Sequence, residues 1–227
     1  MLKAKWLFLL VPVLLNCGGG KKSHKKKDVK LKVTEAAENI KDFDYRLSGG
    51  WVSNCLKTDL AGLGSHRKEA MFVPSGKVVV MEYFYAKSDC QENDLSFTYR
   101  YQGKVDKFHG KSGEDEVRDL DMQVSIQEVI PKSSSLKDWL NRLHVCSVTD
   151  WKTDKAQDIT EKGCSDWFIG DHDTIYDVYN IDSSNKLRFG VNTFFNKGSQ
   201  QTRPSSVSKD MFLERANGLD RLSEMLK

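Results

Sequence analysis

The sequence predicts a mainly β protein whose antiparallel strands form either a sandwich or a closed barrel. Eight or nine short runs rich in β-branched and aromatic residues follow residue 48, and residues that favour turns separate them. Residues 95–102 alternate apolar, mostly aromatic, side chains with polar ones, which is typical of a strand with one solvated face. Residues 77–85 are apolar on both faces and predict a strand that is covered on both sides.

The first strand is expected at residues 49–55. Gly49 and Gly50 permit a close approach of the backbone, and the Trp, Val and Cys that follow favour a half-buried strand. Before it, residues 34–45 predict a lead-in helix, because apolar residues recur along one helical face and Thr34 suits the N-cap. We expect this helix to lie across one end of the strands that follow.

Two more short helices are expected later in the chain. Residues 135–143 combine a capping pattern, Ser135 with Asp138, and apolar residues at the spacing of one helical face. A terminal helix follows Gly218 and carries leucines on one face. The charged stretch 106–119 is expected to be a long solvated loop. The remaining strands are expected at residues 67–73, 77–85, 95–102, 121–130, 174–181, 186–193 and 211–215.

Residues 1–16 predict a secretory signal peptide. Lys3 and Lys5 precede a ten-residue apolar run, about half of the ~20 residues that a membrane-spanning helix needs. The run ends at Cys17 in the order Leu-Leu-Asn-Cys-Gly, which resembles a bacterial lipobox. By that resemblance Cys17 becomes an acylated N-terminus and the attachment site of a lipid anchor. Gly18 follows it in place of Asp, which by the Gram-negative sorting rule implies the outer membrane.

Residues 17–32 are expected to form the lipid anchor and a lysine-rich flexible tether to a single domain at 33–227. The first 32 residues hold nine of the 35 basic residues and one of the 32 acidic residues, which leaves 26 basic and 31 acidic residues for the domain. The positive charge therefore belongs to the N-terminal segments. On an exported chain we expect the tether to lie against anionic lipid head groups, and we expect no nucleic-acid partner.

Four of the five cysteines lie in the domain, an even number that suits disulfides in an exported chain. They are Cys55, Cys90, Cys146 and Cys164. Four cysteines allow three connectivities, and we favour the sequential pairs, Cys55 with Cys90 and Cys146 with Cys164. Each closure would stabilise the fold by roughly 3 to 4 kcal/mol in the chain-entropy model.

The order Gly49-Gly50-Trp51 resembles the G-x-W motif that opens the first strand of lipocalin-like barrels. By that resemblance Gly49 and Trp51 belong to a barrel floor, where the Trp closes one end and an Arg from a late strand crosses it. Arg203 or Arg215 is the candidate for this arginine, and we assign Arg203 to the floor. The implied fold is an antiparallel lipocalin-like barrel with a lead-in helix, one short internal helix and a short C-terminal helix.

A wider part of the domain is similar to a loose group of uncharacterised bacterial lipoproteins with lipocalin-like folds. This resemblance implies the fold and the disulfides, and it implies no known activity. It extends over most of the domain. The segments that carry it are residues 51–55, 85–90, 146–151, 158–160 with Cys164, 176–182, 186–190 and 203–204.

No catalytic motif is present in the sequence, which has no G-x-S-x-G, no H-E-x-x-H and no P-loop. Asp171, His172 and Asp173, with Asp177 nearby, form the one dense run of metal-capable side chains. Because the run precedes a strand, we interpret it as a polar turn. We therefore expect a protein that is not an enzyme and that holds no metal or cofactor.

Two functions stay open. The first is an anchored binding barrel of the cell envelope that holds a small apolar ligand, with Phe97, Tyr99 and Tyr101 lining its interior. In the second, the same aromatic residues fill the barrel, which then acts as a rigid scaffold for protein interaction or inhibition, with a partner that the sequence does not identify. The volume of the interior separates the two, because a ligand pocket needs about 300 Å³ or more.

Overall fold

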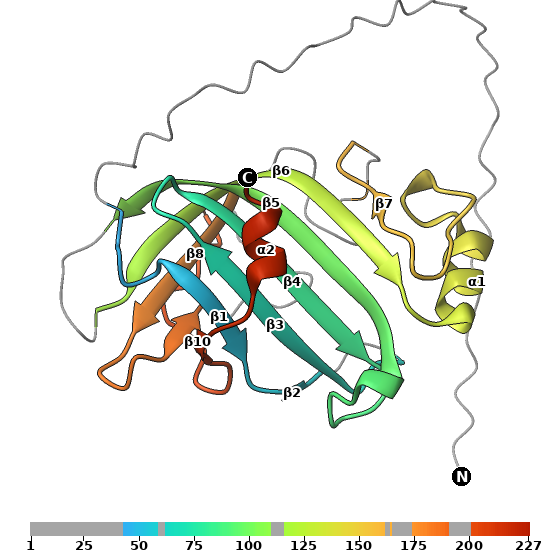
Figure 1. Cartoon of the computed structure of the whole chain (residues 1–227), viewed down its shortest axis with the longest axis horizontal. Coiled ribbons are helices and arrows are strands. Elements are labelled where there is room, and N and C mark those ends of the chain that lie inside the picture. Colours follow the sequence, from blue (N-terminus) through green and yellow to red (C-terminus); the bar gives the residue numbers. More distant parts are fainter. Residues whose placement is uncertain (1–42, 59–61, 110–115, 162–163, 165–173, 191–200) are drawn as a thin grey trace, which may run out of the picture. The chain divides into compact units, whose positions relative to one another are not determined.

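The domain is a closed antiparallel barrel, as Figure 1 shows for a computed structural model of the chain. The structure describes residues 43–58, 62–109, 116–161, 164, 174–190 and 201–227. In these residues eight strands follow one another in the order β1-β10-β9-β8-β6-β5-β4-β3, and β1 pairs with β3 to close the ring. A mainly β fold is confirmed, and a barrel is the architecture adopted. The eight strands are β1 (Gly49–Ser53), β3 (Ser65–Phe72), β4 (Lys77–Tyr85), β5 (Leu95–His109), β6 (Arg118–Pro131), β8 (Thr174–Ile181), β9 (Leu187–Phe189) and β10 (Leu213–Ala216).

Two short strands extend the sheet beyond the closed ring of eight strands. β2 (Leu56–Lys57) follows β1 directly and pairs with the start of β3, so the two form one interrupted strand beside β3. β7 (Gln157–Asp158) pairs with the end of β6, beyond the residues of β6 that pair with β8. Neither strand is predicted by the sequence, because each contains two residues and alternation needs a longer run.

The two α-helices that the structure describes are short and confirm the two later helices expected from the sequence. α1 (Ser134–Leu143) begins after Ser133, whose hydroxyl accepts a 3.2 Å hydrogen bond from the Leu136 amide. The cap is therefore Ser133 and the expected Ser135 lies inside the helix. α2 (Asp220–Glu224) follows Gly218 as expected. Two short 3-10 turns complete the helical residues, at Glu92–Asp94 and Val145–Ser147.

The lead-in helix expected at residues 34–45 lies mostly outside the described residues. Residues 43–48, which are described, form a turn in which the Leu47 amide donates a 2.9 Å hydrogen bond to the Asp44 carbonyl. This turn leads directly into β1. Gly49 has a φ of 108°, a conformation that L side chains rarely adopt, so the first glycine of the pair is required by the backbone.

β5 and β6 are longer than the sequence predicts. β5 continues to His109 and β6 begins at Arg118, so the loop expected over residues 106–119 is wrong at both ends. Two register shifts between β5 and β6, the first beside Gly103, break the alternation of side chains. Because the alternation stops there, the sequence pattern did not predict the ends of these strands. Residues 110–115 lie outside the described part of the loop.

β4 is buried on both faces, as its sequence predicts. The inward side chains Val78 and Phe84 belong to the core inside the barrel. The outward side chains Val79 and Met81 pack with the leucines of the α2 segment in a second cluster. Figure 1 shows α2 lying across β3 and β4. The apolar outer face of the sheet is therefore covered by the end of the chain.

One end of the barrel, which we call the closed end, is covered by the segment before β1. Trp51 is fully buried, and its indole nitrogen donates a 2.8 Å hydrogen bond to the Leu47 carbonyl. The guanidinium of Arg215, the residue of β10 directly opposite Trp51, lies 4.0 Å from the centre of the Trp51 ring. Arg215 also donates to the carbonyls of Arg46 and Ser48. One cation–π contact with Trp51 and two contacts with backbone carbonyls thus hold the segment before β1 over this end of the barrel.

The assignment of Arg203 to the floor is wrong, because Arg215 takes that position. Arg203 donates to the Asp121 carboxylate and, at 2.8 Å, to the Asp177 carbonyl, and it lies 5.3 Å from the centre of the Tyr176 ring. Asp121 and Tyr176 pair with each other across β6 and β8, at positions that alternate with buried inward residues. Arg203 therefore packs on the outer face of the barrel.

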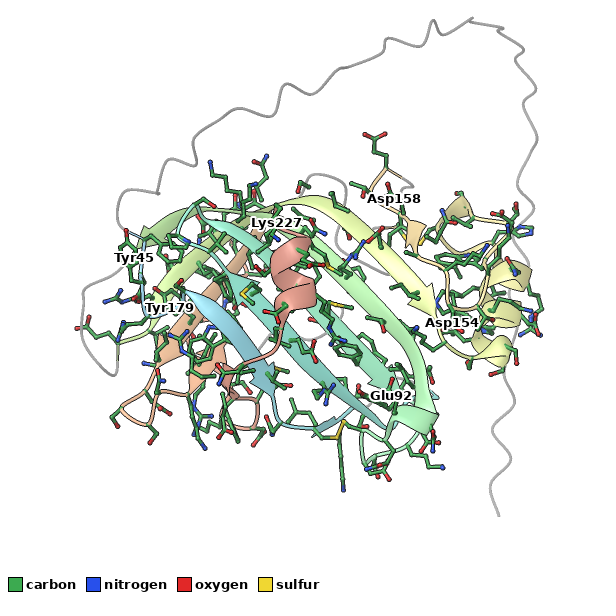
Figure 2. All side chains as sticks on the ribbon, viewed as in Figure 1. Tyr45, Glu92, Asp154, Asp158, Tyr179 and Lys227 are labelled. Atoms are coloured by element: carbon green, nitrogen blue, oxygen red, sulfur yellow. A yellow bond between two sulfur atoms is a disulfide. The ribbon has the colours of Figure 1, made fainter. Side chains whose placement is uncertain are left out.

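A buried carboxylate joins the lead-in segment to the far side of the closed end. Asp44 accepts a 2.9 Å hydrogen bond from Arg118 of β6 and a 3.0 Å bond from the Tyr179 hydroxyl of β8. Arg46 donates to the same carboxylate at 3.1 Å. Figure 2 shows Tyr45 and Tyr179 near each other at this end, far from Glu92. The segment therefore crosses the barrel from β1 to β6 and β8.

Both predicted disulfides are present. Cys55 and Cys90 are joined with a Cα–Cα distance of 5.9 Å, which ties the bend between β1 and β2 to the segment before β5. Cys146 and Cys164 are joined with a Cα–Cα distance of 4.6 Å and close the segment that follows α1. Both bonds constrain segments outside the long barrel strands, which the strand pairing leaves less restricted.

Trp51→Ala should lower the free energy of unfolding by about 3 to 5 kcal/mol, because it empties a fully buried site at the closed end. Denaturant unfolding of the full chain, followed by circular dichroism, measures the change. Tyr45→Ala is the matched control in the same segment: Tyr45 is 63% exposed, and its loss should cost less than about 1 kcal/mol. Equal stability of Trp51→Ala and the parent chain would contradict the floor assignment.

The stability of the closed end should depend on acid pH through Asp44. Burial opposes ionisation, but hydrogen bonds from Arg46 and Tyr179 outweigh it and hold the pKa of Asp44 below its ordinary value of 3.8. A lowered folded-state pKa adds stability above the unfolded-state pKa, and this stability is lost as the pH falls through the folded-state pKa.

Asp44→Asn should therefore be less stable than the parent chain at pH 7, and its stability should fall less below about pH 4. Unfolding curves recorded from neutral to acid pH give the comparison. Parallel pH dependences in the two chains would show that Asp44 does not carry this linkage.

Candidate functional site

An ion pair lies on the inner face of the barrel. Lys68 of β3 and Glu82 of β4 are directly opposite each other, with Nζ and Oε1 2.8 Å apart. Their neighbours two residues away, Ala70 and Val80, belong to the buried core, and residues two apart on a strand share a face. The pair therefore points into the barrel. The two side chains are 17% and 14% exposed, so water still reaches the pair.

Aromatic side chains surround this pair. The Tyr101 hydroxyl of β5 donates to the Glu82 carboxylate at 3.4 Å, and the Lys68 ammonium lies 5.9 Å from the centre of the Phe189 ring. Burial, together with the charges of Glu82 and Asp177, raises the pKa of Tyr101 well above 10.0. The phenol therefore stays protonated and acts as a hydrogen-bond donor over the whole physiological range.

A row of stacked rings continues from the ion pair along the interior, away from the closed end. His66 stacks on Phe84 with ring centres 5.9 Å apart, and Phe84 stacks on Phe97 with centres 4.5 Å apart. Burial lowers the pKa of His66, which favours the neutral imidazole. The Nδ1 atom of His66 is buried without a hydrogen-bond partner in the described structure. The row thus presents an apolar surface with one unsatisfied polar atom.

Tyr99 and Gln127 form the polar contact beside this row. The Tyr99 hydroxyl donates a 2.6 Å hydrogen bond to Oε1 of Gln127, and both side chains are buried. The backbone amide of Gln127 donates to the Thr160 hydroxyl at 2.9 Å, and the backbone amide of Ile159 donates to the backbone carbonyl of Gln127 at 3.0 Å. These bonds connect the inner surface of β6 to the segment that contains β7.

The structure brings together the three lining residues expected from the sequence. Phe97, Tyr99 and Tyr101 point into the barrel from β5 and are all buried. Lys68 and Glu82 are not among the residues expected from the sequence. A signal for Glu82 was present, because it is the one charged residue in the otherwise apolar centre of its strand. Its partner could not be identified, because the register between β3 and β4 is a property of the fold.

The ion pair is a weak source of stability. Charges that leave water lose solvation, and replacing a buried pair with apolar residues of similar volume is often neutral or stabilising by about 1 to 4 kcal/mol. Inward positions of small barrels are commonly filled by apolar side chains, as Ala70 and Phe72 of β3 and Val78, Val80 and Phe84 of β4 are. The pair is therefore better explained by an interaction that uses its charges than by packing.

The expected metal-capable run at residues 171–173 lies outside the described residues. Asp177, which is described, accepts hydrogen bonds from the amides of Val178 and Gly190 at 2.7 and 3.1 Å. Among the described residues, no group of three or more His, Cys, Asp or Glu side chains is arranged to hold a metal ion. Asp177 of β8 thus binds the backbone of Gly190, the residue that follows β9.

No family model matches the chain, and no curated protein matches it. In the described part of the chain, no helix combines the length and the apolar run that a membrane span requires. Fold alone does not determine function, so the chemistry of the inner surface of the barrel is what indicates a function here.

The ion pair should show strong coupling in a double-mutant cycle. Lys68→Met alone leaves the Glu82 carboxylate in the interior without its partner, so it should destabilise the fold by about 1 to 3 kcal/mol. Adding Glu82→Leu should recover most of that loss. Denaturant unfolding of the four chains gives the coupling energy.

The exposed ion pair of Lys87 and Asp94 is the control for this cycle. The Lys87 side chain is 70% exposed, and the coupling of this pair should be small because water and salt screen exposed charges. A coupling between Lys68 and Glu82 as small as that of the control pair would contradict the interior ion pair.

Proposed function

We propose that this chain is a lipid-anchored protein of the cell envelope whose lipocalin-like barrel binds a small amphipathic molecule. The observation that carries the proposal is the Lys68–Glu82 ion pair, with Tyr101, in an interior lined by aromatic rings. Ligand sites combine a mostly apolar lining with a few polar groups that orient the ligand. A barrel whose interior is filled only by its own side chains does not require two charged residues at its centre.

The inner surface defines two parts of the ligand. Its polar group would lie at Lys68, Glu82 and the Tyr101 hydroxyl, where the two charged side chains keep some contact with water. Its apolar part would lie against the rings of Phe84 and Phe97, which continue the interior away from Trp51. Entry from the end opposite Trp51 follows, because the closed end is occupied by the segment before β1.

The proposed location depends on the N-terminal sequence. The apolar run that ends at Cys17 supports export and acylation of that cysteine, and Gly18 supports sorting to the outer membrane. The lysine-rich residues after it would connect the anchor to the barrel along an anionic membrane surface. Because no catalytic motif occurs in the sequence, we propose binding without catalysis.

A rigid scaffold for a protein partner is the second candidate function. The close stacking of Phe84 on Phe97 and the 2.6 Å bond from Tyr99 to Gln127 favour it, because these interior groups already satisfy one another. In that case the barrel interior is filled and its loops make the contacts. The two functions differ in whether a folded barrel takes up a small molecule.

Uptake of fluorescent amphipathic probes tests the proposal. Three probes that share one apolar fluorophore and end in a carboxylate, an amine or an alcohol are titrated into the full chain. We expect at least one to bind, and Tyr101→Phe to weaken that binding by about 3-fold to 10-fold, the effect of one hydrogen bond. The free energy of unfolding of Tyr101→Phe should change by less than about 1 kcal/mol, because the ring volume is kept.

Tyr45→Phe is the control for this experiment, because it removes the same hydroxyl from an exposed ring. It should leave probe binding unchanged. A folded chain that binds none of the three probes would contradict the binding function and favour the scaffold.

A further inference from the structure

A second candidate site lies on the outer surface, independent of the proposed function of the interior. A groove of about 460 Å³ separates the last residues of the chain from β5 and β6. Figure 2 shows Lys227 beside α2 at this side of the barrel. The volume lies within the range of about 300 to 1,000 Å³ that is usual for small-molecule sites. The groove is lined by Lys77, Gln102, Gly103, Lys104, Gln123, Val124, Ser125, Met225, Leu226 and Lys227.

Three lysines surround this groove, and none of the described residues that line it has an acidic side chain. Lys77 of β4 and Lys104 of β5 are directly opposite each other in the sheet, and Lys227 reaches the groove from the end of the chain. In the described structure none of the three forms an ion pair. Lys77 donates a 3.1 Å hydrogen bond to the Leu226 carbonyl, which holds the end of the chain against the groove.

The facing lysines are unfavourable for the sheet by themselves. Like charges directly opposite on neighbouring strands destabilise the pair, and opposite charges stabilise it. Arg100 of β5 gives a favourable example in the same sheet, because it is opposite Glu128 of β6 and forms an ion pair with it. The neighbour of Lys104 on β6 is Gln123, which brings no negative charge. The described side chains that line the groove therefore carry a net positive charge.

We propose that this groove binds a phosphate ester, with its phosphate held by Lys77, Lys104 and Lys227. A phosphate carries up to two negative charges and three oxygens, which match three ammonium groups better than the single charge and two oxygens of a carboxylate do. The amides of Gln102 and Gln123 can bind the polar body of the ligand, and Met225 provides an apolar wall. The bound anion would relieve the repulsion between the facing lysines.

NMR titration of the isotope-labelled full chain with inorganic phosphate and glycerol phosphate tests the site. Backbone amides at residues 102–104 and 123–125 should shift with saturation, and chloride at equal ionic strength should leave them unchanged. Lys104→Gln should weaken phosphate binding about 10-fold, the effect of losing one charge-assisted hydrogen bond. Lys57→Gln is the control, because it removes the same charge from an exposed strand residue outside the groove.

Thermal unfolding gives a second measurement, the melting temperature of each variant with and without phosphate. Phosphate should raise the melting temperature of the parent chain and of Lys57→Gln more than that of Lys104→Gln. Without phosphate, Lys104→Gln should melt at the same or a higher temperature, because it removes the repulsion from Lys77. Equal phosphate effects in the two variants, or no shift at residues 102–104, would overturn the site.

A lipid with a phosphate monoester head group and a soluble phosphate ester present the same chemistry, and vesicles distinguish them. Neutral phosphatidylcholine vesicles are compared with vesicles that also contain phosphatidic acid, a phosphate monoester. Broadening at residues 102–104 only with phosphatidic acid, lost in Lys104→Gln, identifies a lipid head group. Saturable binding of glycerol phosphate without any vesicle effect at these residues identifies a soluble ligand. If neither the vesicles nor glycerol phosphate affects these residues, the proposed phosphate site is overturned. The proposed binding of a ligand inside the barrel does not depend on this result.

Discussion

The structure depends on β1, which pairs with β3 on one side and β10 on the other and so closes the sheet into a barrel. An open sheet has two edges with unpaired backbone groups, and closure removes them. β1 can occupy this position because Gly50 leaves room for a neighbouring segment: a Cβ there would lie 2.9 Å from Leu219 and 3.0 Å from the Ala216 carbonyl. The same strand buries Trp51, so closure of the ring and closure of one end occur together.

Closure divides the side chains into an inner and an outer set, and each set has its own chemistry. The inner set holds the aromatic rings, with Lys68 and Glu82 as charged groups among them. The outer set is covered over β3 and β4 by the α2 segment, where Arg221 donates to the Tyr83 hydroxyl at 2.6 Å. Where this cover ends, the lysine-lined groove begins. The two proposed sites are therefore on opposite faces of one sheet.

Local patterns in the sequence were sufficient for the fold class, both later helices and both disulfides. The alternation at residues 95–102 placed Phe97, Tyr99 and Tyr101 on one face, and the structure places that face inward. Properties that depend on strand register could not be predicted. Arg215 could not be chosen over Arg203 without knowing that it is opposite Trp51. Lys68 and Glu82 are likewise 14 positions apart in the chain and become partners only through the pairing of β3 with β4.

Native mass spectrometry of the full chain, isolated in mild detergent from the cells that produce it, tests the central claim most directly. The account predicts a fraction of molecules with one bound small molecule in addition to the acyl groups proposed at Cys17, retained by Tyr45→Phe and lost from the folded Lys68→Met, Glu82→Leu double variant. A chain that carries no small molecule beyond its covalent mass and takes up no amphipathic molecule offered in excess would contradict ligand binding by the barrel.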